Sequence, residues 1–358
     1  MARAYLRQSI SRSPEFFVAA QEETLFATLA ERMLHAEQQR VARTELASQS
    51  LAVMQSRVRK HLVPYFGLRD VGSITHDDIE RFIAHLSTRR VGSITLSQYL
   101  QSLRKIFSYA LANDLIRKIP PFPKIKLNST PRGGFSATEY WQLLRAARRL
   151  ARTPFAAKAA THRNTAGGIY TSTDDIPREM VWLIGFMVNS FVRPVDVKLI
   201  QHKHIEIVRG EHVYLRLTLP ETKLHKRQIV TLCAAVRIYE SLCKYMQPLG
   251  FTRPDDYLFL PQIKNRKAAS LMIANHFTKV LDATGLRTGN LGQRRTVYSL
   301  RHTAIMFRLL YGKGIDLLTL ARNARTSVDM IEQFYASNLT AEMNIGLLQS
   351  RRLKIDRN

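Results

Sequence analysis

The sequence predicts a mainly α-helical protein with a small β-hairpin, an α+β fold divided into two domains. Residues 25–115 repeat apolar side chains at helical spacing throughout. Residues 119–134 then concentrate proline, glycine and cations, which is typical of a linker. Beyond this segment, two stretches of alternating apolar and polar residues, 213–219 and 228–232, predict a hairpin among further helices.

The chain is long enough to fill two hydrophobic cores, because it has 358 residues and 45% of them are hydrophobic. The expected division follows the changes in composition along the chain. It comprises a flexible N-terminal arm (1–22), a helical domain (23–118), a basic linker (119–135), a second domain (136–340) and a C-terminal tail (341–358).

The charge of the chain indicates a polyanionic partner. Its 54 lysines and arginines against 28 acidic residues give a formal charge of +26, far more than solubility requires. Charge alone does not choose DNA over RNA, and it leaves open a ribosome-associated protein or a basic protein with solvated lysines.

Cys233 and Cys243 are too few for a disulfide framework or a metal knuckle, which fits a reducing cytosol. The N-terminus lacks the apolar core of a signal peptide, and the apolar run 180–188 is too short to span a bilayer. We therefore expect a cytoplasmic, nucleoid-associated protein without a membrane segment.

The first domain is predicted to be a small helical bundle. Leu51, Met54, Val58 and Leu62 share one helical face, and two further faces follow, the first of them behind a Thr75-x-x-Asp78 capping sequence. The polar faces carry cations that can contact phosphates. The candidates are Arg89, Arg90, Arg104 and Lys105 in this domain, with Lys124, Lys126 and Arg132 in the linker.

The second domain begins at a capping box, Ser136-Ala-Thr-Glu. A loop is expected from 152 to 177, followed by a buried helix from 180 to 189 that leads to Arg193 and Asp196. These two residues are three apart on one helical turn, so Asp196 could orient the guanidinium, although the same spacing also describes an ordinary helical ion pair.

Three short helices are predicted near the C-terminus. Ser299 is expected to cap the first, Asp316 the second, and the pair Thr326 and Asp329 the third, which ends at Tyr335. Folding the three helices together could bring Arg301, at the start of the first helix, near Tyr335. An arginine beside a tyrosine suggests phosphate chemistry.

These residues resemble the tyrosine recombinases of the phage integrase type. Residues 298–303, YSLRHT, are similar to the second motif of that family, and residues 323–335, NARTSVDMIEQFY, to its final motif. The segment from Arg193 to Ile200 resembles the first motif, although its usual Thr-Gly pair is missing. Tyr298 stands where the family usually has His or Lys, and Arg325 where it usually has His or Trp.

The resemblance implies a helical core-binding domain, a catalytic domain and a nucleophilic tyrosine. No metal-ligand cluster is evident in the sequence, so two permanently charged guanidiniums are expected to neutralise the phosphate, and no cofactor is expected. The hairpin of the family enters the minor groove and carries the general-acid lysine. The implied catalytic residues are Tyr335, Arg193, Arg301, Lys223 (with Lys226 as second choice), His302, Tyr298 and Arg325, and the hairpin adds Lys226 and Arg227 as DNA contacts.

The function implied is that of a site-specific DNA recombinase, or integrase, that cleaves and rejoins strands through a 3′-phosphotyrosyl intermediate. The expected partners are double-stranded attachment sites, further copies of the chain in a tetramer, and accessory DNA-bending or directionality proteins. Two alternatives stay open. One is a DNA-binding protein of the same fold with weakened catalysis, and the other is a type IB topoisomerase.

Overall fold

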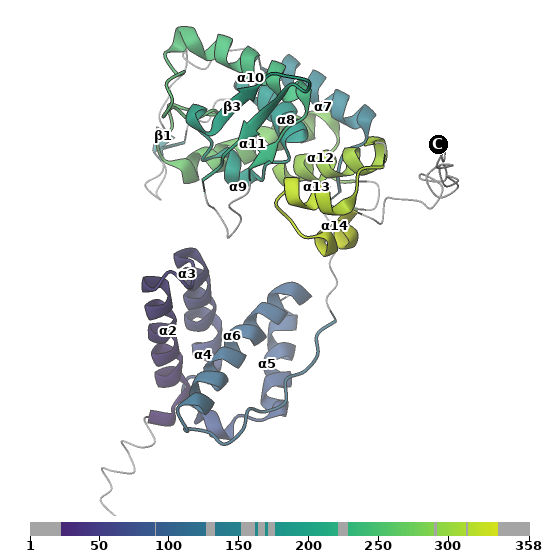
Figure 1. Cartoon of the computed structure of the whole chain (residues 1–358). Helices are drawn as coiled ribbons and strands as arrows, with labels where there is room; N and C mark the ends of the chain where they lie inside the picture. The colour runs from purple at the N-terminus through teal and green to yellow at the C-terminus, as the bar shows by residue number, and fades with distance from the viewer. Residues whose placement is uncertain are drawn as a thin grey trace, which may run out of the picture. The chain divides into compact units, whose positions relative to one another are not determined.

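The computed structural model of the chain forms two compact units, Met1–Ser129 and Thr130–Asn358 (Figure 1). It describes residues 23–89, 91–126, 133–151, 162–163, 169–170, 176–220, 228–289, 292–312 and 314–335. The boundary between the units falls within the proline-rich segment. Each unit has its own hydrophobic core.

The first unit is a bundle of helices around a core of aromatic and aliphatic side chains. Phe26, Phe66 and Phe82 are fully buried there, and Phe66 contacts the other two with ring centroids 5.1 to 5.3 Å apart. The expected capping box is confirmed, because the Asp78 carboxylate accepts the backbone N–H of Thr75 at 2.9 Å. The helices are α2 (Phe26–Ala42), α3 (Ser48–Arg57) with its π-helical continuation η2 (Val58–Leu62), α4 (Val63–Phe66), the 3₁₀ turn η3 (Val71–Ser73), α5 (His76–Thr88) and α6 (Ser93–Ala112).

Both described ends of the proline-rich segment are anchored in cores. Phe122 packs edge-on against Phe107 of α6, with ring centroids 5.9 Å apart. Phe135 is fully buried in the second unit, and its backbone N–H donates to the hydroxyl of Thr303 at 2.9 Å. Composition alone did not reveal these two anchors, because a single phenylalanine in a basic segment carries no periodic signal.

The second unit is mostly helical with a small antiparallel sheet in the order β3-β4-β5, which confirms the predicted α+β class. The predicted hairpin corresponds to β4 (Tyr214–Leu217) and β5 (Ile229–Val230), which pair Leu217 with Ile229. Strand β3 (Ile205–Val208) was not predicted. The other elements are α7 (Ala137–Leu150), β1 (His162–Arg163) paired with β2 (Ile169–Tyr170), α8 (Glu179–Ser190), α9 (Pro194–Val197), η5 (His202–His204), α10 (Cys233–Met246), η6 (Gln247–Leu249), α11 (Arg266–Thr284), α12 (Val297–Tyr311), α13 (Leu317–Asn323) and α14 (Val328–Tyr335).

Helix α8 lies at the centre of this unit, and its burial was predicted from its apolar sequence. It packs against α7, α10, α11 and α12, and Leu183, Ile184, Phe186 and Met187 on its different faces are all at most 1% exposed. A helix packed against four others has a fixed position. Its C-terminal end therefore places the following residues, up to Arg193, with little freedom.

A carboxyl group is buried at the first residue of α8. Glu179 is 1% exposed, and burial raises the pKa of its carboxyl to about 8, against smaller lowering influences from the backbone of Leu260 and the charge of Arg266. Arg266 is itself buried, and its guanidinium donates to the carbonyls of Lys198, Phe259, Leu260 and Ile263. Burial lowers the pKa of Arg266 to about 10.

Replacing Glu179 should change how stability depends on pH. In the unfolded chain this carboxyl ionises near its ordinary pKa of 4.5, whereas in the folded chain it stays protonated up to about pH 8. The folded state therefore binds the extra proton, and the free energy of unfolding falls as pH rises between these values and levels off above them. Glu179→Gln should remove this loss, so its advantage over the unaltered protein should grow across the window. Urea unfolding at about pH 5, 7 and 9 measures this difference. The same series for Glu211→Gln, at an exposed position, serves as control.

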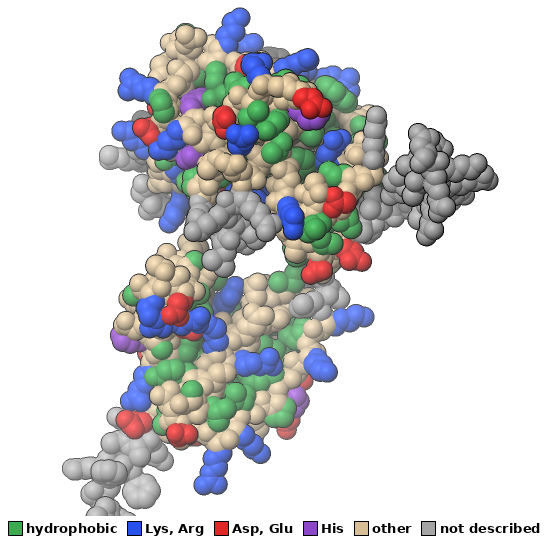
Figure 2. Space-filling model, viewed as in Figure 1, with side chains coloured by type: hydrophobic (Ala, Val, Ile, Leu, Met, Phe, Trp, Pro, Cys, Tyr) green, Lys and Arg blue, Asp and Glu red, His purple; other side chains and the backbone are tan. Residues whose placement is uncertain are grey.

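Lys and Arg side chains are spread over the visible face of both units, with fewer Asp and Glu among them (Figure 2). Among the described residues, none of the helices is long and apolar enough to cross a bilayer.

Candidate active site

Helix α12 carries three of the candidate residues, Tyr298, Arg301 and His302, in its first turns. Its start differs from the expected Ser299 cap, because the helix begins at Val297 and Thr296 is the N-cap, accepting the backbone N–H of Tyr298 at 3.3 Å. The Ser299 hydroxyl instead accepts the backbone N–H of Thr296 at 3.1 Å. The N-cap is thus Thr296, one turn before the predicted Ser299, because Thr296 and Ser299 form a reciprocal capping box. Tyr298 therefore lies inside the helix, one turn before Arg301.

Arg193 is held at the entrance of α9, just after the end of α8. Phe191 ends α8 in a left-handed conformation with φ of 57°, so the chain turns sharply there. Arg193 is extended, and its backbone N–H donates to the Asp196 carboxylate at 3.0 Å. Asp196 is 1% exposed, and through this bond it caps α9. The carboxylate thus fixes the backbone from which the Arg193 side chain extends.

The two candidate arginines converge on neighbouring backbone carbonyls. Arg193 donates from its guanidinium to the carbonyl of Arg325, and Arg301 donates to the carbonyl of Ala324. Arg301 also donates to the carbonyl of Phe191. The guanidiniums of Arg193 and Arg301 are therefore brought together between the end of α8, the start of α12 and the turn after α13.

The turn that receives them joins α13 to α14. Arg325 has a left-handed backbone with φ of 53°, which is uncommon for a residue with a side chain, and that side chain is 2% exposed. Helix α13 begins at the predicted cap, where the Asp316 carboxylate accepts the backbone N–H of Thr319 at 2.9 Å. Helix α14 begins at Val328, and the hydroxyl of Ser327 accepts the backbone N–H of Met330 at 3.2 Å. The expected start at Thr326 is therefore one residue too early.

The candidate nucleophile, Tyr335, is the last residue of α14, as predicted. Helix α14 packs against α12 and α13, and the three lie together in Figure 1. Ile331 is 1% exposed and fixes the middle of α14 in the core. The backbone of Tyr335 is thereby placed in the same unit as the two arginines, while its side chain lies outside the described part of the structure.

His302 and Tyr298 form an aromatic pair on α12. Their ring centroids are 5.1 Å apart at an interplanar angle of 61°, and His302 is 7% exposed. Tyr298 precedes Arg301 by one turn and His302 follows it directly, so both rings are fixed relative to the helix that carries the guanidinium. Tyr298 is half-buried and therefore still reaches the surface of the unit.

Asn323 connects the hairpin to this site, although it was not among the predicted site residues. Its side-chain amide donates to the carbonyl of Val230 at 2.9 Å and accepts the N–H of Val230 at 2.8 Å. The last residue of α13 thus adds itself to strand β5, as a further strand would. The hairpin is thereby tied to the segment that receives the arginines. A signal was present in the sequence, since Asn323 opens the stretch that resembles the final recombinase motif.

The hairpin tip carries the remaining candidates, Lys223, Lys226 and Arg227, and these lie outside the described residues, as do Arg90 and Arg132. The other candidate DNA contacts are described. Arg89, Lys124 and Lys126 are exposed. The guanidinium of Arg104 lies 4.6 Å from the ring centroid of Phe122, and Lys105 forms an ion pair with Glu37 at 2.8 Å.

Comparison with known protein families gives a match within the first unit. Residues 25–127 match the family described as the phage integrase SAM-like domain. A search of curated protein sequences finds no match.

Solved structures match over most of the chain. A Tn1549 transposon integrase in complex with a circular intermediate DNA has a TM-score of 0.61 at 12% identity, covering 91% of this chain and 98% of the other. A lambda integrase dimer bound to a COC′ core site has a TM-score of 0.59 at 16% identity, covering 86% and 95%. A lambda integrase tetramer bound to a Holliday junction has a TM-score of 0.61 at 16% identity, covering 91% and 85%. The resemblance found in the sequence is therefore confirmed at the level of the fold.

Proposed function

From its integrase fold, we propose that this protein is a site-specific DNA recombinase that cleaves and rejoins DNA strands through a 3′-phosphotyrosyl intermediate. The observation that carries the proposal is the convergence of Arg193 and Arg301 on the carbonyls of Ala324 and Arg325, immediately before the helix that ends in Tyr335. The formal charge of +26 and the relatives solved with DNA support the same function.

The proposed roles follow from the chemistry of a phosphodiester. The Tyr335 oxygen attacks phosphorus, the bond to the 5′ oxygen breaks, and that oxygen leaves with a proton from a general acid, for which Lys223 is our candidate. Arg193 and Arg301 stabilise the charge on the non-bridging oxygens, since each guanidinium can fork onto two of them. The phosphotyrosyl bond keeps the energy of the broken one, so a 5′ hydroxyl from another strand can reverse the step.

The burial of the arginines supports an anionic ligand. Arg301 and Arg325 are each 2% exposed, while Arg193 is half-buried beside them. Burying several permanent cations in one place costs free energy unless an opposite charge compensates, and Asp196 supplies one carboxylate. A DNA phosphate would supply further negative charge and would replace backbone carbonyls as the acceptor.

The remaining candidates are assigned supporting roles. Tyr298 would donate its hydroxyl to the phosphate where the family usually has His or Lys, and Arg325 would serve as the donor or packing group in place of His or Trp. His302 would act as a base or a phosphate ligand. We further propose that copies of the chain assemble on the two DNA sites, with accessory DNA-bending or directionality proteins.

One observation favours a second function, a DNA-binding protein of this fold with weak cleavage. Arg301 is almost fully buried and already donates to two carbonyls, so a phosphate must displace them to bind it. A nicked suicide duplex distinguishes the two functions. An active recombinase accumulates a covalent adduct, because the released fragment diffuses away and cannot religate. The weakened protein binds the DNA and retards its migration in a native gel, but it forms no adduct.

A type IB topoisomerase would form the same adduct, and a different assay separates it. Supercoiled DNA that lacks any sequence bound specifically by the protein should stay supercoiled with a recombinase. Relaxation of such DNA at the rate seen on DNA carrying the bound sequence would favour the topoisomerase.

Lys223→Ala should slow cleavage of ordinary DNA and recover on DNA whose bridging 5′ oxygen is replaced by sulfur. The reason is that a thiolate leaves without a proton, so a missing general acid no longer limits the rate. Cleavage rates of both substrates measure the effect, with Lys226→Ala as the matched control. Rescue of Lys226→Ala instead would assign the role to Lys226, and slow cleavage of the sulfur substrate by Lys223→Ala would show that Lys223 is not the acid.

A further inference from the structure

Carboxylates are unevenly distributed over the helices of the first unit. Helix α2 carries Glu31 and Glu37, and α5 carries Asp77, Asp78 and Glu80. The helical run 48–66, made of α3, η2 and α4, contains no acidic residue, and neither does α6. These two carboxylate-free stretches contact each other through α3 and η2. Glu31 and Glu37 of α2 reach these stretches, but they pair with Arg59 and Lys105, so their charges are compensated there. DNA phosphates can therefore approach this side of the unit with little repulsion.

A groove of about 310 Å³ lies between α3 and α6. Its polar lining includes side chains that can donate hydrogen bonds, namely Gln49, Arg57, Gln98, Gln101 and Lys105. Glutamine and arginine are the residue types that recognise purine edges in the major groove by paired hydrogen bonds. The lining thus combines a favourable charge with groups that distinguish bases.

Arg57 and Gln98 form a fixed pair across this groove. The Arg57 guanidinium donates to the side-chain oxygen of Gln98 at 2.6 Å, and both side chains are half-buried. Because a guanidinium has no acceptor, the atom that it contacts must be the amide oxygen. The groups left to other partners are then the remaining N–H donors of Arg57 and the amide NH₂ of Gln98. A pair that presents donors fits the two acceptors of guanine, O6 and N7.

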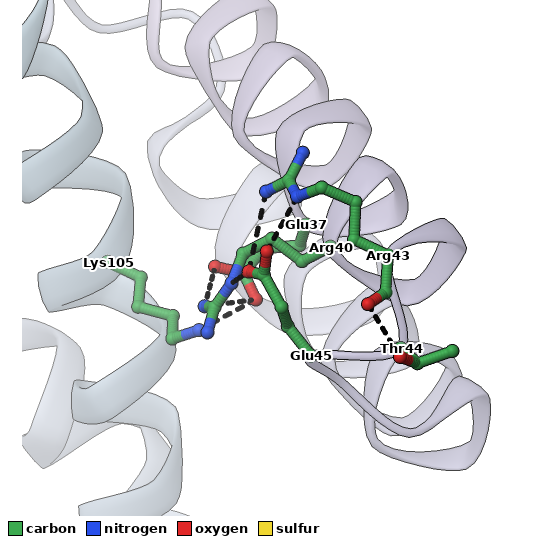
Figure 3. Close-up of polar contacts among 6 residues, drawn as sticks. All are labelled: Glu37, Arg40, Arg43, Thr44, Glu45 and Lys105. Atoms are coloured by element: carbon green, nitrogen blue, oxygen red, sulfur yellow. Dashed lines mark hydrogen bonds and ion pairs between the residues drawn. The ribbon is translucent and has the colours of Figure 1, made fainter.

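An ion-pair network links α6 to the turn before α3 (Figure 3). Lys105 of α6 contacts Glu37 of α2 at 2.8 Å, and Glu37 also contacts Arg40 at 3.1 Å. Glu45, in the turn that leads into α3, contacts Arg40 at 3.2 Å and Arg43 at 2.6 Å. The network therefore ties α6 to the turn before α3 by way of α2. Lys105 has a carboxylate partner here, so its candidate role as a phosphate contact is accompanied by this structural one.

We infer that the Arg57–Gln98 pair, in the groove between α3 and α6, selects a guanine in the duplex DNA that this unit binds. This inference rests on the proposed function, since it takes the substrate to be duplex DNA. It adds to that function the pair of residues that reads one base pair of the site.

The test is a selection of sequences from a random duplex pool by the full-length chain carrying Tyr335→Phe, so that binding is read without cleavage. The parent should select a motif that includes a G·C pair sensitive to Arg57. Arg57→Ala should lower the preference for that pair by about tenfold or more and leave the other positions unchanged. Arg57→Lys keeps the charge but loses the fork, and should lose the same preference with nearly the same salt dependence. Gln98→Ala should weaken it through the lost partner of Arg57.

Arg59→Ala is the matched control. Arg59 lies two residues further along the same helical run, but its guanidinium forms a two-bond ion pair with Glu31 of α2, at 2.8 and 2.9 Å. Its removal should leave the selected motif unchanged.

Two results would overturn the inference. If all Arg57 and Gln98 variants select the motif of the parent, the groove does not read bases. A uniform loss of affinity for every sequence in Arg57→Ala, with the motif retained in Arg57→Lys, would make Arg57 a phosphate contact. Failure of the proposed function is recognised separately, because it is measured as the absence of a covalent adduct when the Tyr335 protein meets the selected sequence.

Discussion

Tyr335→Phe is expected to abolish the covalent protein–DNA adduct while leaving DNA affinity close to that of the unaltered protein. The change removes one oxygen, the one that would bond to phosphorus, and keeps the ring at the end of α14. A tyrosine hydroxyl has an ordinary pKa of about 10, so it needs the positive field of nearby arginines to attack efficiently. Denaturing gels of nicked duplexes carrying the selected sequence measure the adduct, and a binding titration measures affinity.

Tyr311→Phe provides a matched control for this experiment. Tyr311 is the last residue of α12 and is 59% exposed, so loss of its hydroxyl should affect neither the adduct nor binding. An adduct that persists in Tyr335→Phe would assign the nucleophile to another tyrosine. A large loss of affinity in Tyr335→Phe would show that the hydroxyl contributes mainly to binding.

Arg193→Ala and Arg301→Ala should each slow strand cleavage by roughly 10²-fold or more, by analogy with the removal of one preorganised donor from an oxyanion site. Arg301 also holds the carbonyls of Phe191 and Ala324, so its truncation leaves buried acceptors without their donor and should lower stability as well. Single-turnover cleavage of the nicked duplex at saturating protein measures the chemical step apart from binding.

The two effects of Arg301 can be separated. Arg301→Lys keeps a positive charge but cannot fork onto two oxygens, and it should cleave slowly at a temperature where thermal unfolding shows the variant to be folded. Arg322→Ala, on the exposed face of α13, removes an arginine close in sequence to the same turn and should cleave normally. Cleavage by Arg193→Ala or Arg301→Ala within a few-fold of the unaltered rate would remove that arginine from the proposed site.

Local patterns predicted the helices well because each has its own signals. The capping boxes at Thr75 and Ser136, the cap at Asp316 and the apolar run of α8 all rest on residues within one or two turns of each other. The predicted starts of α12 and α14 differ from the observed ones, because several neighbouring hydroxyls can cap the same backbone there. Strand β3 was missed because its pairing partner, β4, makes it a strand, and that partner lies further along the chain.

The α+β class, the resemblance to tyrosine recombinases and the residue types available for phosphate chemistry can all be read from the sequence. This is possible because helix periodicity, caps and motif spacing are local properties of the chain. Which side chains meet depends on how the chain folds. The contacts of Arg193 with Arg325, of Asn323 with Val230 and of Arg57 with Gln98 join residues that are distant in sequence. Such contacts depend on how α8, α12 and α13 pack in one unit, and α3 and α6 in the other, and packing is a property of all the elements of a core together.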